Sequence, residues 1–247
     1  MFEIKIDDAR YWKNCIDAIG SLIDEGSFNI TKEGVSLKAM DASGISMVSF
    51  FIPNKAISKY NIDKSSTVGI NLDNFSRIMN SSRNNEQLIL KEDANKLSVE
   101  FSGQNSKRRY KLPIIEVRKD SEKEPKIDFE SFVEVKGDSL KEMLKDALML
   151  SSYVGLKTDK GTFRVTAKGD AGELEEEHLD NAEFIKKLDV NKPSSSSFNL
   201  DYLIKIINSC PSNSNIQISL KTDEPIKVDY AIGDAKVSYY LAPYMEN

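Results

Sequence analysis

Cysteine and histidine are scarce in this chain of 247 residues, which has two cysteines and a single histidine. Neither Cys15 nor Cys210 has a second cysteine or a histidine at the spacing of zinc ligands, which argues against a structural zinc site. Each cysteine falls on the apolar stripe of an expected helix, so we expect two buried hydrophobic residues. His178 stands in an acidic run without a catalytic arrangement around it, and we expect it at the solvated surface. The sequence therefore predicts no metal, no cofactor and no enzyme activity.

An excess of basic residues and long apolar runs are also missing. The chain has 34 Lys and Arg against 39 Asp and Glu, a formal charge of -5, so it does not grip nucleic acid by bulk charge. Any role on DNA requires locally segregated charge. No apolar run reaches the roughly 18 residues of a membrane span, and the segment 1–5 does not resemble a signal peptide. We expect a soluble intracellular protein without a membrane partner.

What the chain does contain is an internal repeat. Six of eleven positions are identical between segments 71–81 and 199–209, and most of the others keep their character. The offset between the two segments is about half the chain length, which is typical of a duplicated protein. Two similar domains follow from this repeat.

The match extends beyond these eleven residues. Each half begins with an alternating strand and an amphipathic helix, continues with a strand, the repeated segment as a second helix, and further strands. No glycine-rich turn of the dinucleotide or P-loop type occurs between a strand and a helix. We therefore predict an α+β fold with sheets and helices in layers. In the first strand, Phe2, Ile4 and Ile6 match Val133 and Val135. In the helix that follows, Trp12, Cys15, Ile16, Ile19 and Ile23 match Leu140, Met143, Leu144, Ala147 and Leu148. In a later strand, Leu97, Val99 and Phe101 match Ile226, Val228 and Tyr230.

The two halves are separated by a charged stretch in which apolar residues do not recur at the spacing of a helix or a strand. We predict an N-terminal domain at 1–116, a connector at 117–127 and a C-terminal domain at 128–247. The connector is either a passive tether or part of a binding site, and the residues alone leave both open. A second polar segment, 192–197, is expected to be a loop.

Basic residues recur on the polar faces of all four expected helices. A single lysine on a solvated helix face carries no functional meaning. Recurrence on four helices in an acidic chain instead favours weak attraction to a nucleic-acid backbone. The helix positions are Lys13, Arg77, Lys141, Lys145 and Lys205, and Arg83 follows shortly after the second helix.

Two strand-like segments carry opposite charge. If both are sheet edges, they favour a head-to-tail contact between copies of the chain; otherwise they are two unrelated charged surface strands. The basic segment has Lys107, Arg108, Arg109 and Lys111, and the acidic segment has Glu173, Glu175 and Glu177.

Four stretches of the chain resemble the DNA sliding clamps of the proliferating cell nuclear antigen family, of archaeal type. They are Met1–Glu3, Glu33–Asp41, Lys111–Glu116 and Tyr240–Pro243. The resemblance implies a DNA-clamp fold assembled as a trimeric ring, with helices inside and sheets outside. It also implies a processivity factor of DNA replication and repair, whose helix cations touch encircled duplex DNA without reading bases.

The resemblance further implies a partner-peptide pocket near the connector. Its partners would be DNA polymerase, flap endonuclease, DNA ligase and the clamp loader, in the cytoplasm or nucleoid of an archaeon or in a eukaryotic nucleus. Gly44 and Tyr244 depart from the family pattern and leave partner preference open. Several of the pocket positions are also ordinary core residue types. The pocket positions are Met40, Ile45, Met47, Ile127, Pro225, Tyr240, Leu241, Ala242 and Pro243.

Three other interpretations stand beside this one. The chain can be a checkpoint-type clamp subunit, or a paralogue that assembles into a heteromeric ring. From a different class, it can be a duplicated enzyme or small-ligand protein. The lack of clustered histidine, cysteine or paired carboxylates argues against the last of these.

Overall fold

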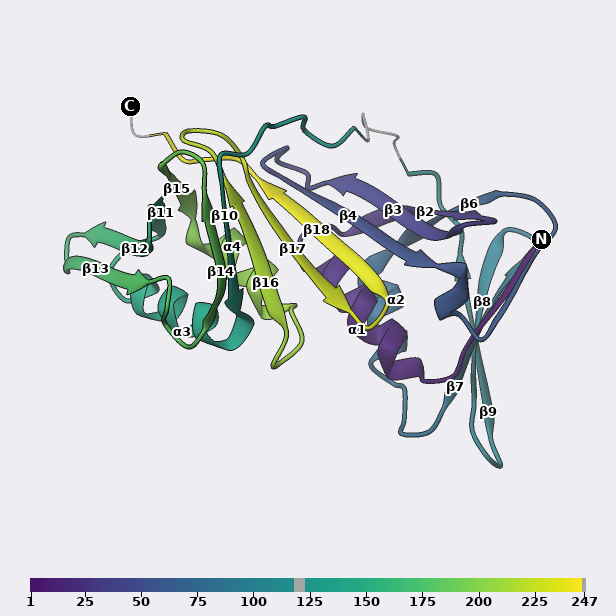
Figure 1. Ribbon diagram of the computed structural model, residues 1–247. Coiled ribbons are helices and arrows are strands. Elements are labelled where there is room, and N and C mark those ends of the chain that lie inside the picture. The colour runs from purple at the N-terminus through teal and green to yellow at the C-terminus, as the bar shows by residue number, and fades with distance from the viewer. Residues whose placement is uncertain (118–122, 246–247) are drawn as a thin grey trace. The chain divides into compact units, whose positions relative to one another are not determined.

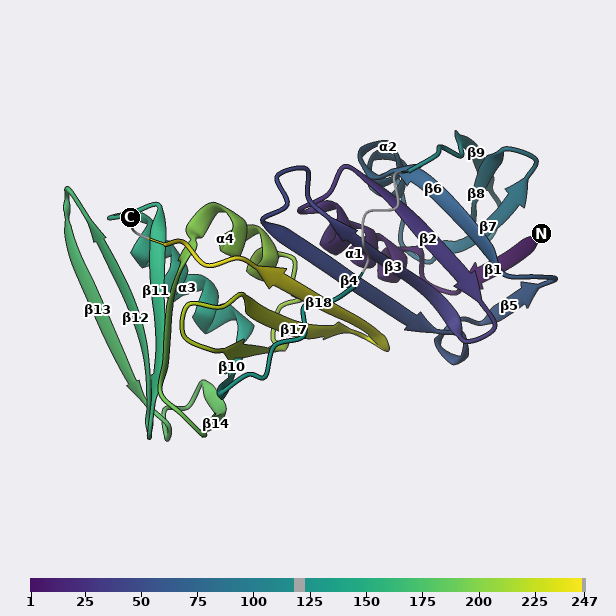
Figure 2. The ribbon, with the colours of Figure 1, turned by 90° about the horizontal axis from the view of Figure 1, so that it is seen from above.

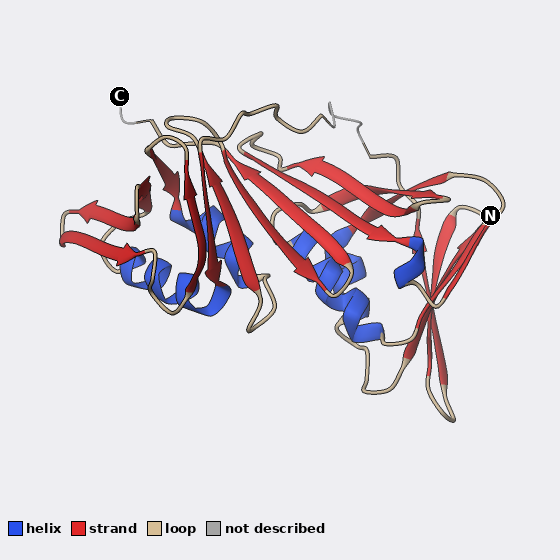
Figure 3. Ribbon diagram, in the orientation of Figure 1, coloured by secondary structure: helices blue, strands red, loops and turns tan. Residues whose placement is uncertain are grey.

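The computed structural model describes residues 1–117 and 123–245 and divides the chain into two compact units (Figure 1). Unit 1 consists of Met1–Ala42, Val48–Lys123 and Ala231–Val237. Unit 2 consists of Ser43–Met47, Glu124–Tyr230 and Ser238–Asn247. Each unit combines two helices with strands (Figure 3).

In unit 1 the helices α1 (Ala9–Gly20) and α2 (Leu72–Met79) pack against each other. α1 also contacts β7, whereas α2 contacts β2, β6 and β9. One antiparallel sheet has the order β5-β1-β7-β8-β9, and a second group of strands has the order β4-β3-β2-β6. The strands are β1 Phe2–Ile6, β2 Glu25–Thr31, β3 Gly34–Met40, β4 Ser46–Pro53, β5 Lys59–Ile62, β6 Ser66–Asn71, β7 Gln87–Asp93, β8 Lys96–Ser102 and β9 Lys107–Pro113, with a 3-10 turn at Asn54–Ala56.

Unit 2 is built in the same way around α3 (Gly137–Leu148) and α4 (Leu200–Asn208). α3 contacts β10, β11 and β12, and α4 contacts β15. The strands follow the orders β14-β10-β16-β17-β18 and β13-β12-β11-β15. Their bounds are β10 Ser131–Lys136, β11 Tyr153–Asp159, β12 Thr162–Gly169, β13 Gly172–Leu179, β14 Ile185–Val190, β15 Ser194–Asn199, β16 Asn215–Leu220, β17 Ile226–Ile232 and β18 Ala235–Leu241.

The strand orders repeat between the units. Strands β10, β16, β17, β18 and β14 take the places that β1, β7, β8, β9 and β5 hold in unit 1. Strands β11, β12, β13 and β15 likewise correspond to β2, β3, β4 and β6. The predicted α+β fold with two similar domains is confirmed.

The repeated Asn-Leu-Asp triplets mark the starts of α2 and α4. The side-chain oxygen of Asn71 accepts a hydrogen bond from the N–H of Asn74 at 2.9 Å. That of Asn199 accepts from the N–H groups of Asp201 and Tyr202, at 2.9 and 3.3 Å. These N–H groups have no partner within their helix, so an asparagine at the cap position stabilises the first turn.

Segment 194–197, which we expected to be a loop, is part of strand β15. Ser194 and Ser196 are buried in spite of their hydroxyl groups. The hydroxyl of Ser196 donates to the carbonyl of Lys221 at 3.2 Å and accepts from the N–H of Asp223 at 2.7 Å. Because neighbouring backbone satisfies these hydroxyls, a run of serines can occupy a buried strand.

Three apolar positions expected on helices had different outcomes. Cys15 lies within α1 as predicted, whereas Cys210 lies two residues after the end of α4, outside the expected helix. The thiols of Cys15 and Cys210 are buried, as predicted, and burial raises the pKa of Cys15 to about 12. Leu148 was expected on the apolar stripe of its helix, but its exposed fraction is 45%. Leu148 is the last residue of α3, and the chain leaves the helix there.

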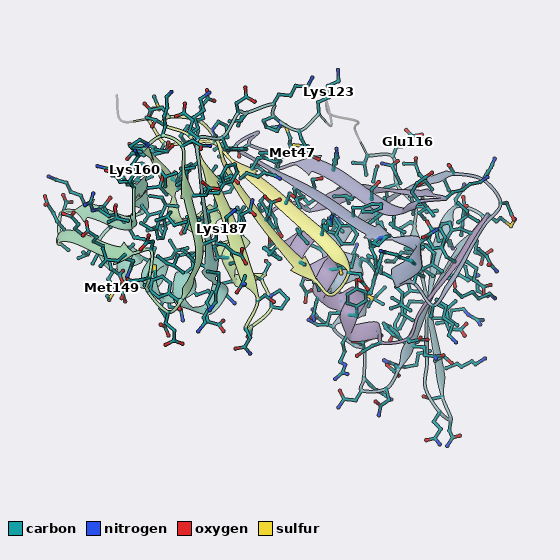
Figure 4. The ribbon with its side chains drawn as sticks, viewed as in Figure 1. Met47, Glu116, Lys123, Met149, Lys160 and Lys187 are labelled. Atoms are coloured by element: carbon teal, nitrogen blue, oxygen red, sulfur yellow. The ribbon has the colours of Figure 1, made fainter. Side chains whose placement is uncertain are left out.

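The segment after β9 runs beside strand β6. The N–H of Ile115 donates to the carbonyl of Gly69 at 2.9 Å, and that of Ile114 donates to the carbonyl of Asn95 at 3.0 Å. A Cβ at position 69 would lie 2.1 Å from the carbonyl oxygen of Ile115, so glycine is required for this close approach. The chain is thereby held in place as far as the neighbourhood of Glu116 (Figure 4).

Candidate functional site

The three cations predicted in unit 1 differ in whether they are already paired within the unit. Arg77 in the last turn of α2 and Arg83 in the following loop are exposed, and neither forms an ion pair within the described part of the chain. Lys13 on α1 instead pairs with Asp17, one turn further along. Asp17 also accepts a hydrogen bond from the hydroxyl of Ser76 on α2 at 3.0 Å. Lys13 therefore belongs to a polar connection between α1 and α2.

The cations of unit 2 divide in the same way. Lys145 on α3 and Lys205 on α4 are exposed. Lys141 has a side chain only 18% exposed, and its ammonium donates to the carbonyl of Cys210 at 3.0 Å. The same ammonium lies 3.6 Å from a carboxylate oxygen of Asp138. The prediction that Lys141 lies on a solvated helix face is thus wrong, because its side chain extends to the segment after α4.

Four of the six predicted cations can therefore reach an external partner directly. They are not accompanied by a purely basic surface, since Asp73 on α2 and Asp201 on α4 are also exposed. Exposed guanidinium and ammonium groups on long side chains can contact phosphates without base recognition. The four are Arg77, Arg83, Lys145 and Lys205.

Most of the predicted pocket residues lie in unit 2, where two of them meet. The N–H of Ala242, just after β18, donates to the carbonyl of Ile45 at 2.9 Å. Ile45 is 41% exposed. Met40 is also exposed but belongs to unit 1. Of the others, Met47, Tyr240 and Leu241 are buried, and Ile127, Pro225 and Pro243 are half-buried.

Tyr240 connects β18 to the C-terminal part of the predicted connector. Its hydroxyl donates to a carboxylate oxygen of Glu124 at 3.0 Å. The ammonium of Lys227 lies 5.9 Å from the centre of its ring. The pKa of Tyr240 lies well above its usual value. Burial is the main cause, and the hydrogen bond to Glu124 is the second. Residues 118–122 of the predicted connector lie outside the described residues. Lys123, which is labelled in Figure 4, and Glu124 belong to the described residues.

Strand β9, the basic segment, is one of the two edge strands of its sheet. Lys107, Arg109 and Lys111 alternate along β9 and are exposed. Two of them already have partners, because Arg109 Nε donates to Glu100 at 2.9 Å and Lys111 donates to Asp93 at 2.6 Å. The basic character of this face is therefore smaller than the sequence suggests.

Arg108 points to the opposite face of β9 from these three residues. Its guanidinium donates to the buried carboxylate of Glu86 at 2.7 Å and lies 5.0 Å from the ring centre of Phe101. Its side chain is 22% exposed. Arg108 is thus held within unit 1, where it compensates a buried carboxylate.

Strand β13, the acidic segment, is likewise an edge strand of its sheet (Figure 2). Glu173, Glu175 and Glu177 alternate on its exposed face. Lys168 pairs with Glu173 at 2.7 Å, and Arg164 pairs with Glu177 and lies 3.9 Å from Glu175. Both charged segments are sheet edges, as head-to-tail pairing requires.

His178 is not the solvated surface residue that we expected. Its side chain is 16% exposed, and its ring packs edge-on against Phe184 with centroids 4.8 Å apart. Its Nε2 lies 3.1 Å from a carboxylate oxygen of Glu176. The strand alternation explains this position, because residues 176 and 178 face away from the exposed glutamates.

Within residues 1–117 and 123–245, no group of three or more His, Cys, Asp and Glu side chains is placed to hold a metal ion. The helices in these ranges are also too short or too polar to cross a membrane.

Family comparisons cover nearly the whole chain. The proliferating cell nuclear antigen N-terminal domain matches residues 1–123, and the C-terminal domain of the same family matches residues 123–245. The chain belongs to the proliferating cell nuclear antigen family. Proteins named DNA polymerase sliding clamp from Thermococcus onnurineus, Thermococcus gammatolerans and Methanococcus vannielii are 33%, 32% and 31% identical to it. These alignments cover 97% or more of this chain and 98% or more of each relative.

Solved structures of PCNA family members share the fold. PCNA from Thermococcus kodakaraensis has a TM-score of 0.94 at 23% identity, covering 99% of this chain and 100% of that one. A. fulgidus PCNA, solved with the C-terminal region of FEN-1 bound, has a TM-score of 0.90 at 26% identity, with 100% of both chains covered.

Several contacts of the candidate residues in this PCNA family member were not predicted from the sequence. The pairing of Lys13 and Asp17 has a signal in the sequence, since the two residues are four apart on one helix. The bond from Lys141 to Cys210 and the stacking of Tyr153 on Tyr244 join residues far apart in the chain and have no such signal.

Proposed function

We propose that this PCNA family member is a DNA polymerase sliding clamp, a processivity factor that encircles duplex DNA and tethers replication and repair enzymes. The observation that carries the proposal is the repetition of one helix pair in both units, each with exposed cations, in a chain of net charge -5. Full-length similarity to proteins named DNA polymerase sliding clamp supports it. This role is non-enzymatic. A protein with this role is located with the chromosomal DNA of the cell.

A ring explains how an acidic chain can serve DNA. A closed ring cannot leave an encircled duplex sideways, so weak contacts between cations and phosphates are enough. In the proposed trimer, the exposed cations of α2, α3 and α4 would face the duplex. Lys13 and Lys141 would contribute through the position of the helices, since each is already bonded within its unit.

A charge-matched pair of triple variants tests this arrangement. Replacing Arg77, Lys145 and Lys205 by alanine removes one exposed cation from each of three helices. The control replaces the exposed Lys160, Lys187 and Lys236, which lie outside the helices, two of them labelled in Figure 4. We expect the helix variant to be retained several-fold less well on primed circular DNA, with weaker salt dependence, and to support shorter primer extension. Equal behaviour of the two variants would contradict a DNA-facing role for these helices.

We further propose that partner proteins bind unit 2 beside the connector 117–127, at the segment where Ile45 meets Ala242. The partners would be DNA polymerase, flap endonuclease, DNA ligase and the clamp loader. The similarity to A. fulgidus PCNA, solved with the C-terminal region of FEN-1 bound, supports this. Ile45 leaves an apolar side chain exposed at this position, where an apolar side chain of a peptide would contact it.

Binding of a peptide from the C-terminal region of A. fulgidus FEN-1 tests the site. Ile45→Asp places a charge on an exposed side chain and should weaken binding at least tenfold, because an apolar anchor would meet a carboxylate. Met149→Asp is the control, since Met149 is also an exposed apolar residue of unit 2 (Figure 4). Fluorescence anisotropy measures both affinities. Equal losses in the two variants would argue against a site at Ile45.

We propose a head-to-tail trimer in which β9 of one subunit pairs with β13 of the next. Both strands are sheet edges, and their exposed faces are basic and acidic respectively. Light scattering should find a trimer at micromolar concentration. A stable monomer would overturn the homotrimer, and a monomer that assembles only with paralogues would identify a heteromeric clamp.

A further inference from the structure

The C-terminal segment of unit 2 is fixed at two points after β18 ends. The N–H of Ala242 donates to the carbonyl of Ile45 at 2.9 Å, and the N–H of Tyr244 donates to the carbonyl of Ser197 at 2.7 Å. Between these points stands Pro243, whose ring restricts its φ angle. The segment is therefore held extended from Leu241 to Tyr244.

An aromatic stack adds a third contact. The ring of Tyr244 lies on the ring of Tyr153, at the start of β11, with centroids 3.7 Å apart and planes 23° from parallel. Tyr244 remains 39% exposed and Met245 is 57% exposed. Because Tyr244 stays partly exposed, its stacking on Tyr153 acts mainly by restricting the positions that the segment can adopt.

The stack also completes the cover of a sheet edge. β15 ends the order β13-β12-β11-β15, and the turn after β16 bonds to its first residues. Further along β15, the backbone of Ser197 forms an antiparallel bridge with Tyr244. The segment thus occupies a position where an unordered tail would leave backbone groups of an edge strand uncovered.

We propose that the stack of Tyr153 and Tyr244 is a lock that orders the C-terminal segment beside the partner-binding site before a partner arrives. The inference rests on the proposed function, because Ala242 within the same segment contacts Ile45. Tyr244 is then a positioning residue for peptide binding. An ordered segment loses less conformational freedom when a peptide binds next to it, so the lock raises affinity.

The test combines peptide affinity with hydrogen exchange on the full chain. Tyr244→Ala should weaken binding of the A. fulgidus FEN-1 peptide about tenfold, the cost of ordering roughly one residue of backbone. Tyr244→Phe keeps the stacked ring and should bind as the wild type does. Met245→Ala is the matched control, since it truncates an exposed neighbour without touching the stack, and it should change nothing.

Amide exchange reports on the lock separately from the peptide. In Tyr153→Ala, the Tyr244 amide should exchange several-fold faster, with an unchanged melting temperature. Unchanged exchange, or peptide binding by Tyr244→Ala as tight as or tighter than the wild type, would overturn the inference. If the wild-type chain bound no peptide, the proposed partner site would be wrong, whereas the exchange of the Tyr244 amide would still decide whether the stack orders the segment.

Discussion

At the scale of single residues, Tyr60 shows how one hydroxyl makes folding depend on pH. Its hydroxyl lies 2.7 Å from the carbonyl oxygen of Thr31 and 2.8 Å from that of Gly34. Burial raises the pKa of Tyr60 to about 12, and a phenolate would face two carbonyl oxygens. Because the folded pKa exceeds the unfolded value of about 10, the stabilisation is complete below pH 10 and is lost as the pH rises towards 12.

We therefore expect the free energy of unfolding to fall between pH 10 and 12, and to fall less steeply in Tyr60→Phe. At pH 8 the variant should be less stable by about 1 kcal/mol, because the two carbonyls lose their donor. Urea unfolding followed by circular dichroism measures both effects. Other buried tyrosines contribute to the slope of both proteins, so the difference between them is the relevant quantity. Identical slopes would show that Tyr60 does not titrate in this range.

Lys141 and Lys145 make a second comparison between single residues. Lys141→Met removes a charge-assisted hydrogen bond to the carbonyl of Cys210 and should cost about 1–2 kcal/mol. Lys145→Met alters an exposed side chain and should change stability by less than about 0.5 kcal/mol. Urea unfolding at neutral pH checks the pair. Equal stability of the two variants would mean that the bond to Cys210 adds nothing to folding.

The same comparison shows what sequence reasoning achieves for a site residue. Helical spacing correctly places Lys141 and Lys145 one turn apart on α3. It does not reveal that Lys141 reaches Cys210, because that contact depends on how α3 and α4 pack. Arg108 is similar, since its partner Glu86 is 22 residues away and precedes a different strand. Charge and periodicity predict a face, whereas the partner of a side chain is determined by tertiary packing.

At the scale of elements, the starts of α2 and α4 were predictable from the repeated triplets. Asn71→Ala and Asn199→Ala should each lower stability by about 1 kcal/mol, because the N–H groups of the first turn lose their acceptor. Asn74→Ala is the control, since Asn74 is an exposed residue within α2 and should cost little. Thermal unfolding followed by circular dichroism measures the three variants. A loss as large in Asn74→Ala as in Asn71→Ala would contradict the capping explanation.

Strands were predictable where apolar residues alternate and were missed where they do not. Leu97, Val99 and Phe101 in β8 are buried and show the period of two that predicted them. β15 contains four consecutive serines, so its period is invisible in hydropathy. The buried hydroxyl of Ser196 in this strand is bonded to the backbone of Lys221 and Asp223, which lie outside the strand.

At the scale of the whole molecule, the duplication is the strongest prediction, because it involves the order of every strand. The repeat at 71–81 and 199–209 marks equivalent helices, and the strand orders of the two units agree throughout. The assembly has a weaker basis in the sequence. Many of the exposed charges on β9 and β13 are satisfied within their own unit, so opposite sign alone cannot specify how many subunits close a ring.

Assembly therefore calls for a variant that changes a charge without disturbing its own unit. Arg108 is unsuitable, because reversing its charge would leave the buried carboxylate of Glu86 unpaired. Lys107 is exposed and forms no ion pair within the described residues, so Lys107→Glu should weaken the proposed trimer by about 1 kcal/mol per interface, less at high salt. Glu175 is exposed and lies 3.9 Å from Arg164 of its own unit, whose main partner is Glu177, so Glu175→Lys should also weaken the trimer. The two changes combined should restore much of the assembly, since opposite charges again meet across the edge. Light scattering during dilution, at low and high salt, compares the three variants with the wild type. Unchanged assembly in both single variants would place the subunit contact away from these two faces.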